Sequence, residues 1–502
     1  MRITRARLIV QAFFLGLFLF LAYMTSFGRM RGYRVSLFLE LDPLVAIGTA
    51  LSTHSIYRDL VWGLLVAVAT LLLGRFFCGW VCPFGTLLHL TGWLFGPRTT
   101  EQRIERNRYR PVNGLKYALL AAFIMAAAAG TLQLGLLDPM ALLLRSLTTA
   151  VWPALNQQRP WMFAHPPIFH LGWFIGGMLL LLLAINLAAP RFFCRALCPL
   201  GAALGVLSRF SLWRIDRDPD KCVDCDLCLQ GCEGASDPHT HLRKAECFAC
   251  MNCLDDCPYD ALSFRFLPRI DREITHADVG RRRIVVGSIA GFVFAPLARL
   301  GGNTTKTADK AVIRPPGSRA EAEFLERCTK CEQCLRVCPT NVLQPALFQA
   351  GVEGLWTPIL DNRVGYCELN CVLCGQVCET GAIRRISLEE KLGLAAYDGR
   401  PIRLGTAFFD RGRCLPWAME TPCVVCEEVC PTSPKAIFTR TVDIVARDGR
   451  PASLRLPYVD AARCIGCGIC EHECPVKDAA GVRVSAIGET RAVDRSLLLA
   501  QE

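Results

Sequence analysis

The feature that most constrains this chain is a tightly spaced cysteine run, which occurs twice in direct succession within residues 222–258. Each run has the spacing C-x2-C-x2-C-x3-C. Three thiolates on so short a loop can cap three irons of one cubane, and the fourth iron is then reached by a cysteine from elsewhere. A zinc ribbon also uses C-x2-C pairs, but it needs two pairs with a longer spacer between them. The spacing therefore predicts [4Fe-4S] clusters and not zinc.

Related runs follow along the chain, so that the 28 cysteines comprise six sets of four and two further pairs. The fourth cysteine of each run in a two-cluster ferredoxin ligates the other run's cluster, so six [4Fe-4S] clusters are predicted, with exchange between the first two sets. For the last four sets, consecutive pairing fits the spacing as well as pairing of first with fourth and second with third. No cysteine remains for an ordinary disulfide, which disfavours a disulfide-rich secreted fold. The six sets are Cys222, Cys225, Cys228 and Cys232; Cys247, Cys250, Cys253 and Cys257; Cys328, Cys331, Cys334 and Cys338; Cys367, Cys371, Cys374 and Cys378; Cys414, Cys423, Cys426 and Cys430; and Cys464, Cys467, Cys470 and Cys474.

Two runs depart from the usual ending, in which a proline closes the turn after the last ligand. Glu233 follows Cys232 and Glu379 follows Cys378, whereas proline follows the other four runs. The change removes no ligand. For the cluster that Cys232 serves, we expect it to alter the reduction potential or the solvent exposure.

The four remaining cysteines form two C-x3-C-P pairs, Cys78 with Cys82 and Cys194 with Cys198. Their surroundings repeat, because R-F-F-C-G-W-V-C-P-F-G from residue 75 is matched by R-F-F-C-R-A-L-C-P-L-G from residue 191. If the pairs face each other at two helix ends, four thiolates could hold a seventh cluster. Another metal, a redox dithiol and plain packing of small thiols stay open, since cysteines four apart on one helix share a face.

Apolar sequence is concentrated in the first two hundred residues of a chain whose hydrophobic fraction is 52% and mean hydropathy +0.30. The first apolar stretch follows Arg2, Arg5 and Arg7 without an evident cleavage site, so it predicts an uncleaved anchor and not a signal peptide. Together with the matched motifs, the pattern predicts a duplicated two-helix unit. Its four membrane-spanning stretches are 8–27, 56–77, 115–136 and 171–189.

The placement of positive charge predicts the orientation of this membrane unit. The loop between the third and fourth stretches contains only Arg145 and Arg159 as Lys or Arg residues. The loop between the second and third stretches is rich in basic residues. By the positive-inside rule the N-terminus, this middle loop and the segment after the fourth stretch are cytoplasmic, although Arg29, Arg31 and Arg34 run against the rule. The net charge of +11 is thus explained by topology, and no nucleic-acid partner is expected. The basic residues of the middle loop are Arg98, Arg103, Arg106, Arg108, Arg110 and Lys116.

Two Asp-Pro pairs, at Asp42 and Asp138, precede apolar runs in matching positions of the two halves. An ionisable group near the bilayer could accept protons from quinol. Aspartate followed by proline is also the usual start of a helix, with aspartate as N-cap and proline in the first turn. We favour the cap.

A second crossing is predicted beyond the central cysteine runs. Arg281, Arg282 and Arg283 precede the apolar stretch 284–300, which resembles a twin-arginine export signal in mid-chain. A buried soluble helix is the alternative, because the length is marginal for a span. A fifth helix here would carry everything beyond a Gly- and Pro-containing linker at 301–318 out of the cytoplasm.

The expected fold class is a multidomain chain in which an α-helical membrane unit, with four helices as a two-helix repeat plus a fifth, is joined to α+β ferredoxin-like [4Fe-4S] domains. Residues 1–210 form the four-helix membrane domain and 211–270 a cytoplasmic two-cluster domain. Residues 271–318 form the twin-arginine-like transmembrane anchor and linker, and 319–502 an extracytoplasmic four-cluster domain. The expected location is the bacterial inner membrane, crossed several times.

The two C-x3-C-P pairs at Cys78, Cys82, Cys194 and Cys198, followed by two ferredoxin runs, resemble the NapH and MauN family of membrane iron-sulfur proteins. The arginine-led segment with four further runs resembles the exported NapG and MauM family. Together these resemblances cover almost the whole chain, which is similar to a fusion of the two. NosR-type proteins share the first half but lack the four-cluster continuation.

The resemblance implies that the protein takes electrons from the quinol pool and passes them, often through a c-type cytochrome, to a periplasmic reductase such as nitrate reductase. The MauM and MauN likeness also allows a maturation factor for a periplasmic redox enzyme. A redox-sensing membrane protein would carry a recognisable sensory or output domain, and the sequence shows none. Neither a nucleotide-binding glycine motif nor a catalytic triad is evident, so substrate chemistry is expected in a partner, except for a possible quinol dehydrogenase step.

Overall fold

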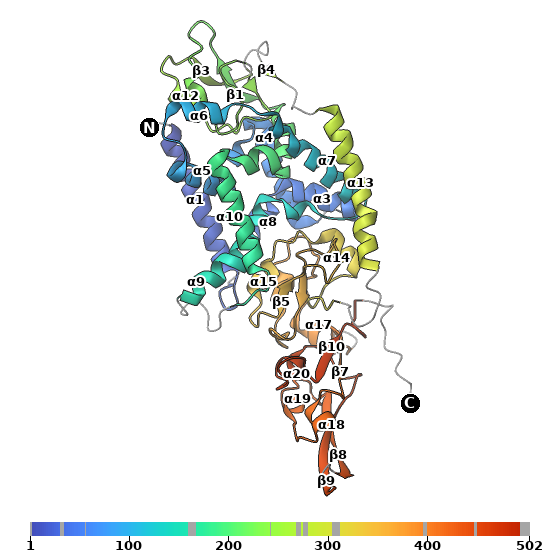
Figure 1. Ribbon diagram of the computed structural model, residues 1–502. Helices are drawn as coiled ribbons and strands as arrows, with labels where there is room; N and C mark the ends of the chain where they lie inside the picture. Colours follow the sequence, from blue (N-terminus) through green and yellow to red (C-terminus); the bar gives the residue numbers. More distant parts are fainter. Residues whose placement is uncertain are drawn as a thin grey trace.

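The protein is described by a computed structural model over residues 3–30, 35–55, 57–158, 167–240, 242–267, 273–274, 280–303, 312–394, 399–445 and 449–491. Figure 1 shows a helical unit in the middle, built from residues 3–208, with a cysteine-rich unit at each end. The central unit (213–274) covers one end, near the N-terminus, and the C-terminal unit (312–491) extends from the opposite end.

The helical unit consists of one long helix and two sets of shorter ones that repeat the sequence duplication. The first half contains α3 (Pro43–Thr53), α4 (Gly63–Leu73) and α5 (Pro83–Phe95), and the second contains α8 (Pro139–Ser146), α10 (Gly172–Ala188) and α11 (Pro199–Ser208). The other elements are α1 (Ile3–Met24), α2 (Leu37–Glu40), α6 (Thr100–Asn107), α7 (Leu115–Ala128), α9 (Trp152–Gln158), and the turns η1 (Arg58–Trp62), η3 (Pro111–Gly114), η4 (Leu134–Leu136) and η5 (Leu147–Val151).

The two Asp-Pro pairs begin α3 and α8, as the helix-cap interpretation predicts. Asp42 accepts hydrogen bonds from the backbone N–H groups of Leu44 and Val45 at 2.8 and 3.2 Å, and proline fills the first turn. Asp138 does the same for Met140 and Ala141, both at 2.9 Å. Both carboxylates are fully buried, and the cap is confirmed.

The apolar helices differ in length from the predicted membrane stretches. Among the described residues, two helical stretches are long and apolar enough to cross a bilayer, Ile3–Met24 and Pro111–Ala128. Within 56–77 the helix ends at Leu73, because Gly74 has a φ of +74°, and within 115–136 it ends at Ala128. The N-terminal region is thus mostly helical with two candidate spans, and the number of crossings in the repeat stays a prediction. Shorter apolar helices occupy Pro43–Thr53, Leu60–Leu73, Gly172–Ala188 and Pro199–Ser208.

The helix α13 (Arg281–Asn303) follows the central unit and lies alongside α7 for much of its length (Figure 1). Gly287 and Gly291 face α7, and a Cβ at either position would collide with the backbone carbonyl of Ala118 or Ala122. Small residues four apart permit such close helix contact in membranes. Part of the predicted linker 301–318, residues 304–311, lies outside the described residues.

The central unit has a small α+β fold. Strands β1 (Trp213–Arg217) and β3 (Leu262–Phe266) pair antiparallel, with Trp213 opposite Phe266, and β2 (Leu242–Arg243) pairs parallel with β4 (Glu273–Ile274). The short helices η8 (Leu227–Leu229) and α12 (Asn252–Asp256) lie within the two cysteine runs. The hydrophobic core of this unit contains Cys228 and Cys253 beside Ile215 and Leu262, so the motif loops are part of the core.

The C-terminal unit has two lobes of the same type. The first lobe is next to the helical unit and the second carries the long hairpin at the far end (Figure 1). Strands β5 (Leu343–Pro345) and β6 (Pro358–Leu360) pair in the first lobe; β7 (Thr406–Phe409) with β10 (Val482–Ser485), and β8 (Ile437–Val445) with β9 (Pro451–Val459), pair in the second. The helices are α14 (Glu321–Arg327), α15 (Gln333–Val337), α16 (Leu373–Gln376), α17 (Leu388–Leu392), α18 (Leu415–Met419), α19 (Val425–Glu428) and α20 (Ile469–His472).

Candidate iron-sulfur sites

The central unit places the fourth cysteine of each run near the other run, and this gives two candidate cluster sites. Cys228 interacts electrostatically with Cys232, with Cys222 and Cys225, and, from the other run, with Cys257. Cys253 in turn interacts with Cys247, Cys250 and Cys232. We call these groups site 1 (Cys222, Cys225, Cys228 and Cys257) and site 2 (Cys247, Cys250, Cys253 and Cys232).

In the C-terminal unit neighbouring runs lie together, which favours the consecutive pairing that the spacing left open. Cys378 approaches the first of these runs and Cys338 approaches the second. Cys474 likewise joins the third run and Cys430 the fourth. This gives site 3 (Cys328, Cys331, Cys334 and Cys378), site 4 (Cys367, Cys371, Cys374 and Cys338), site 5 (Cys414, Cys423, Cys426 and Cys474) and site 6 (Cys464, Cys467, Cys470 and Cys430).

The four regularly spaced loops share a backbone shape that suits a bulky inorganic group. In each loop the residue before the second cysteine and the residue after it have positive φ, as at Asp224 and Asp226 or Lys330 and Glu332. Such conformations are uncommon outside glycine, so their recurrence points to a loop wrapped around one common object. Backbone N–H groups also donate to ligand sulfurs, for example Ser236 to Cys232 at 3.3 Å. The residues therefore fit iron-sulfur clusters.

Burial at these sites disfavours free thiolates. Burial raises the pKa of Cys228 and Cys247 to about 12, so the free thiols would be protonated at neutral pH. Iron would stabilise the thiolates that burial disfavours, and the clusters would supply one-electron transfer. Among the described residues no three His, Cys, Asp or Glu side chains converge on a position for a single metal ion.

The C-x3-C-P pairs do not lie on continuous helices, which corrects the expectation of cysteines four apart on one helix face. Cys78 lies in the π-turn η2 (Phe77–Val81), and Cys82 is extended and caps α5, where its sulfur accepts from Gly85 N–H at 3.3 Å. Proline disfavours helical dihedrals in the residue before it, so Pro83 interrupts the helix at Cys82. Cys194, in η7 (Phe193–Leu197), and Cys198, which caps α11, repeat this arrangement.

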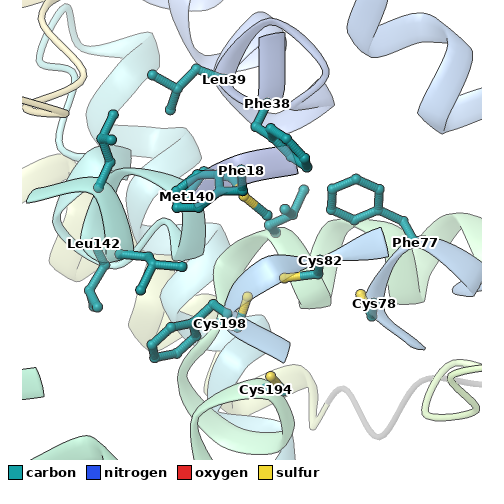
Figure 2. Packing of buried hydrophobic residues seen from close by; sticks show 14 of the residues in the cluster. Phe18, Phe38, Leu39, Phe77, Cys78, Cys82, Met140, Leu142, Cys194 and Cys198 are labelled. Atoms are coloured by element: carbon teal, nitrogen blue, oxygen red, sulfur yellow. The ribbon is translucent and has the colours of Figure 1, made fainter. Parts of the chain in front are cut away.

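The two pairs come together inside the helical unit. Figure 2 shows the four sulfurs in one region, with Phe18, Phe77 and Met140 nearby. All four thiols are buried, and those of Cys82 and Cys198 each interact electrostatically with both Cys78 and Cys194. The predicted meeting of the pairs is therefore observed, and their role as ligands, redox thiols or packing stays a prediction.

The repeated arginines connect one half of the repeat to the other. Arg191 donates to the carbonyl of Cys78 at 3.2 Å and lies close to Gly85. In the matching arrangement the guanidinium of Arg75 lies against Gly201, where a Cβ would approach it to 2.8 Å. The recurring residues of the R-F-F-C-x3-C-P-x-G motif are thus explained by contacts across the pseudo-repeat.

Arg191, together with Arg7 of α1, holds the central unit on the helical unit. Glu233 is ion-paired with Arg7 and Arg191, the latter at 2.6 Å, and with His89 at 2.7 Å. Although burial would raise the pKa of Glu233, the charges of Arg191, Arg7 and His89 hold it well below its usual range. The glutamate in place of proline after Cys232 therefore has a docking role that the spacing did not reveal.

A second glutamate repeats this docking on the other half. Glu246, directly before the first cysteine of site 2, is ion-paired with Lys116 and lies 3.6 Å from Arg75. Tyr117 donates to the same carboxylate at 2.9 Å. The guanidinium of Arg75 also lies over the ring of Phe248, 4.6 Å from the ring centroid. Sequence reasoning missed this set, and the repeated arginine was its only signal.

The C-terminal unit docks on the opposite end of the helical unit through the loop of site 3. Arg145, fully buried in α8, donates to the carbonyl of Lys330 at 3.2 Å and lies over the ring of Trp356 at 4.0 Å. Lys330 in turn hydrogen-bonds Gln133. Arg145 is therefore not a loop residue that sets topology, as the charge count assumed, and it packs against Trp356.

The six candidate sites lie in order along the molecule, with the helical unit between sites 2 and 3 (Figure 1). Site 4 meets site 6 where the N–H of Cys367 donates to the carbonyl of Cys467 at 2.8 Å. At the helical unit, Cys250 of site 2 belongs to the core that contains the four C-x3-C-P cysteines, and Cys331 of site 3 packs against that core. The order along the molecule is therefore sites 1 and 2, the C-x3-C-P thiols, then sites 3, 4, 6 and 5.

Two family models, both described as a 4Fe-4S binding domain, match the chain. The first covers residues 59–100 and 169–217, each of which holds one C-x3-C-P pair. The second covers residues 324–344 and 457–477, which hold the first and last runs of the C-terminal unit. No solved structure matches.

Similar proteins are also found among characterised sequences. The putative electron transport protein YccM of Escherichia coli is 33% identical over 205 residues, which are 39% of this chain and 52% of YccM. The methylamine utilization ferredoxin-type protein MauM of Paracoccus denitrificans is 31% identical over 216 residues, 42% of this chain and 87% of MauM. The ferredoxin-type protein NapG of Escherichia coli is 31% identical over 208 residues, 40% of this chain and 84% of NapG.

The chain thus spans about half the length of YccM but most of MauM and NapG. The cysteine sites agree with this likeness, because both family models that match are iron-sulfur domains. The protein is therefore an iron-sulfur electron-transfer protein with several 4Fe-4S domains, and it belongs to the family of ferredoxin-type proteins that includes MauM and NapG.

Proposed function

We propose that this chain is a membrane-bound conduit that oxidises quinol and passes the electrons to a reductase outside the cytoplasm. In this proposal it combines a NapH- or MauN-type membrane part with a NapG- or MauM-type exported part. Sites 1 to 6 hold six [4Fe-4S] clusters, and the C-x3-C-P thiols form a seventh metal or redox site. A c-type cytochrome and a periplasmic reductase such as nitrate reductase receive the electrons.

The observation that carries the proposal is the position of the helical unit between two groups of sites. One buried core reaches from Cys250 of site 2, through the C-x3-C-P cysteines, to the loop of Cys331 in site 3. An electron path between two compartments needs such a continuous series. The positive-inside pattern supports an inner-membrane protein with sites 1 and 2 in the cytoplasm and sites 3 to 6 outside.

A reduction experiment on the whole protein tests this function. Anaerobically purified protein in lipid nanodiscs should contain at least about 24 iron atoms per chain, from six four-iron clusters. Ubiquinol or menaquinol analogues should then reduce clusters that are visible by electron paramagnetic resonance. If dithionite reduces the clusters and no quinol does, the quinol function is wrong.

The C-x3-C-P pairs are tested by a double variant, Cys78→Ala with Cys194→Ala. If these thiols connect the two ends, quinol should reduce the clusters of one unit only, and dithionite should still reduce all of them. Cys225→Ala is the matched control, because it removes a ligand of site 1 at the end of the series. Unchanged reduction in the double variant would assign the pairs to packing.

A maturation factor for a periplasmic redox enzyme is the second candidate, favoured by the likeness to the methylamine utilization protein MauM. In that case deletion of the gene would leave the partner enzyme present but without its mature cofactor. For a conduit, the partner would be mature and active with an artificial electron donor. Assay of the partner in a deletion strain with such a donor separates the two functions.

A further inference from the structure

A cavity of about 650 Å³ lies where the C-terminal unit meets the helical unit. One wall comes from the end of α1 and from η5, with Phe27 and Thr148, and the other comes from the cysteine loops, with Cys338, Tyr366 and His472. Ligand pockets of this size, mostly apolar with a few polar groups, hold small organic molecules. The proposed function requires such a site for quinol, and the inference below rests on that function.

The cavity has direct access to one candidate cluster, because Cys338 is both a lining residue and the exchanged fourth member of site 4. A molecule in the cavity would therefore be next to the iron-sulfur group held by Cys338, Cys367, Cys371 and Cys374. His472 and Tyr366 extend this wall toward site 6, and their rings lie 5.6 Å apart.

Site 4 also has a buried ammonium group that donates directly to one of its cysteine sulfurs. Lys391 is buried, and its ammonium donates to the sulfur of Cys367 at 3.5 Å and to the carbonyls of Glu368 and Cys371 at 2.6 and 2.7 Å. Hydrogen bonds to ligand sulfur and nearby positive charge both raise the reduction potential of a cluster. Site 4 is thus suited to be the first electron acceptor.

Some polar atoms of the residues that line the cavity have no hydrogen-bond partner among the described residues. Thr148 is 1% exposed, and its hydroxyl has no hydrogen-bond partner among the described residues. Nδ1 of His472 on the opposite wall is also without one there. A buried hydroxyl without a partner is unfavourable, and a hydrogen bond from a ligand would satisfy it.

Exposed apolar side chains of the cavity lining could contact the apolar tail of a quinol. Phe27 follows the candidate span α1 and is 60% exposed, and Ile168 precedes the apolar helix α10 and is 62% exposed. Both line the cavity. A quinol with its head group inside would therefore have its tail along apolar helix surface.

We propose that this cavity is the quinol head-group site and that Thr148 hydrogen-bonds one of the two ring oxygens. Oxidation breaks the two O–H bonds of the quinol. Its two protons go to the water outside, and its two electrons would pass singly to the one-electron acceptor that Cys338, Cys367, Cys371 and Cys374 would hold, and from there toward site 6. The quinone that remains then leaves toward the lipid.

Binding is tested directly on the full-length holoprotein in nanodiscs, with decyl-ubiquinone and menadione as probes. Thr148→Val removes only the hydroxyl and should weaken binding about fivefold, the value of one hydrogen bond. Thr148→Ser should bind as the natural protein does. Thr149→Val is the matched control, because the Thr149 hydroxyl bonds the carbonyl of Arg145 and does not line the cavity.

An azido-quinone photolabel gives a readout that does not depend on turnover. It should label residues 335–341 or 167–169, and less so in Thr148→Val. Labelling elsewhere together with unchanged binding in Thr148→Val would overturn the site while quinol still reduces the clusters. Failure of every quinol to reduce the natural protein would instead overturn the proposed function.

The role of site 4 as the first electron acceptor is tested by a redox titration of Lys391 variants. Lys391→Met should lower the midpoint potential of one cluster in a redox titration and leave quinone binding unchanged, whereas Lys391→Arg should restore most of the potential. An unchanged set of potentials in Lys391→Met would overturn the assignment of site 4 as the tuned acceptor.

Discussion

Glutamate replaces proline after the fourth cysteine in two runs, and both side chains have partners that fix a cluster loop. Glu233 is bound by Arg7, Arg191 and His89 of the helical unit. Glu379 is buried in the C-terminal unit, where it accepts from Thr329 at 2.6 Å. Proline stiffens a turn but offers no side chain for such contacts. At these two loops the contact with neighbouring segments replaces the stiffness of the turn.

A residue with a measurable pH effect is Glu321, which connects the entry and exit of the C-terminal unit. Its carboxylate accepts from Arg314 at 2.6 Å and from Arg491 at 2.7 Å. Burial alone would raise the pKa of Glu321, but these guanidinium groups lower it from 4.5 to about 2. Because the folded value is the lower one, the stabilisation is complete above pH 4.5 and is lost as the pH falls toward 2.

We therefore expect Glu321→Gln to lower the free energy of unfolding of the C-terminal unit by about 1–2 kcal/mol at pH 7, a figure reduced because the side chain is a third exposed. The difference from the natural protein should shrink in urea titrations between pH 4.5 and pH 3. Glu323→Gln is the control, since Glu323 is 39% exposed and its ion pairs are local ones to residues four positions away, Arg319 and Arg327. A pH-independent difference would contradict the assignment.

The grouping of the cysteines into runs of candidate ligands could be predicted from the sequence, because ligation of one cluster fixes the spacing of the cysteines within a run. The exchange of Cys232 with Cys257 could be predicted for the same reason. Consecutive pairing in the C-terminal unit could not, because it depends on which loops fold together. The partners of Glu233 and Glu246 belong to other segments of the chain, Arg7 and Arg191 for the first and Lys116 for the second, so no local pattern identified them.

At the scale of elements, the helical unit is built from short helices that begin at proline. Asp42 and Cys82 each cap a helix whose first residue is proline, and Asp138 and Cys198 repeat this. Hydropathy predicted apolar stretches in roughly the right places but not their ends, because a positive φ at Gly74 and the restriction before Pro83 are local backbone effects. The caps, in contrast, were predictable from the Asp-Pro pairs.

The contact between α7 and α13 is the element whose packing is easiest to test. Gly291→Leu should separate the two helices, because the new side chain would meet the backbone carbonyl of Ala122, which cannot move aside. We expect a loss of stability of about 1–3 kcal/mol, the usual cost of overpacking, seen as a lower melting temperature in detergent. Ala290→Leu is the matched control, since Ala290 is exposed on the other side of α13. Equal effects of the two substitutions would contradict the close glycine contact.

At the scale of the whole molecule, the arrangement of units is what links the candidate sites to a membrane function. The two cysteine-rich units lie at opposite ends of the helical unit, and α13 lies along its side between them (Figure 1). Membrane orientation follows from the positive-inside rule applied to the sequence, not from the fold, since two apolar helices alone do not define a topology. A direct measurement of sidedness is therefore the decisive test of the whole arrangement.

If α13 carries the chain across the membrane, the two cysteine-rich units must be accessible from opposite sides. We expect a viral-protease site inserted between Val445 and Pro451, at the end of the β8–β9 hairpin, to be cut in right-side-out vesicles. The same site inserted after Tyr259, which is exposed in the central unit, should be cut only in inverted vesicles. Immunoblots of terminal tags would report the fragments. Cleavage of both sites from one side would place sites 1 to 6 in one compartment and exclude electron transfer across the membrane by this series.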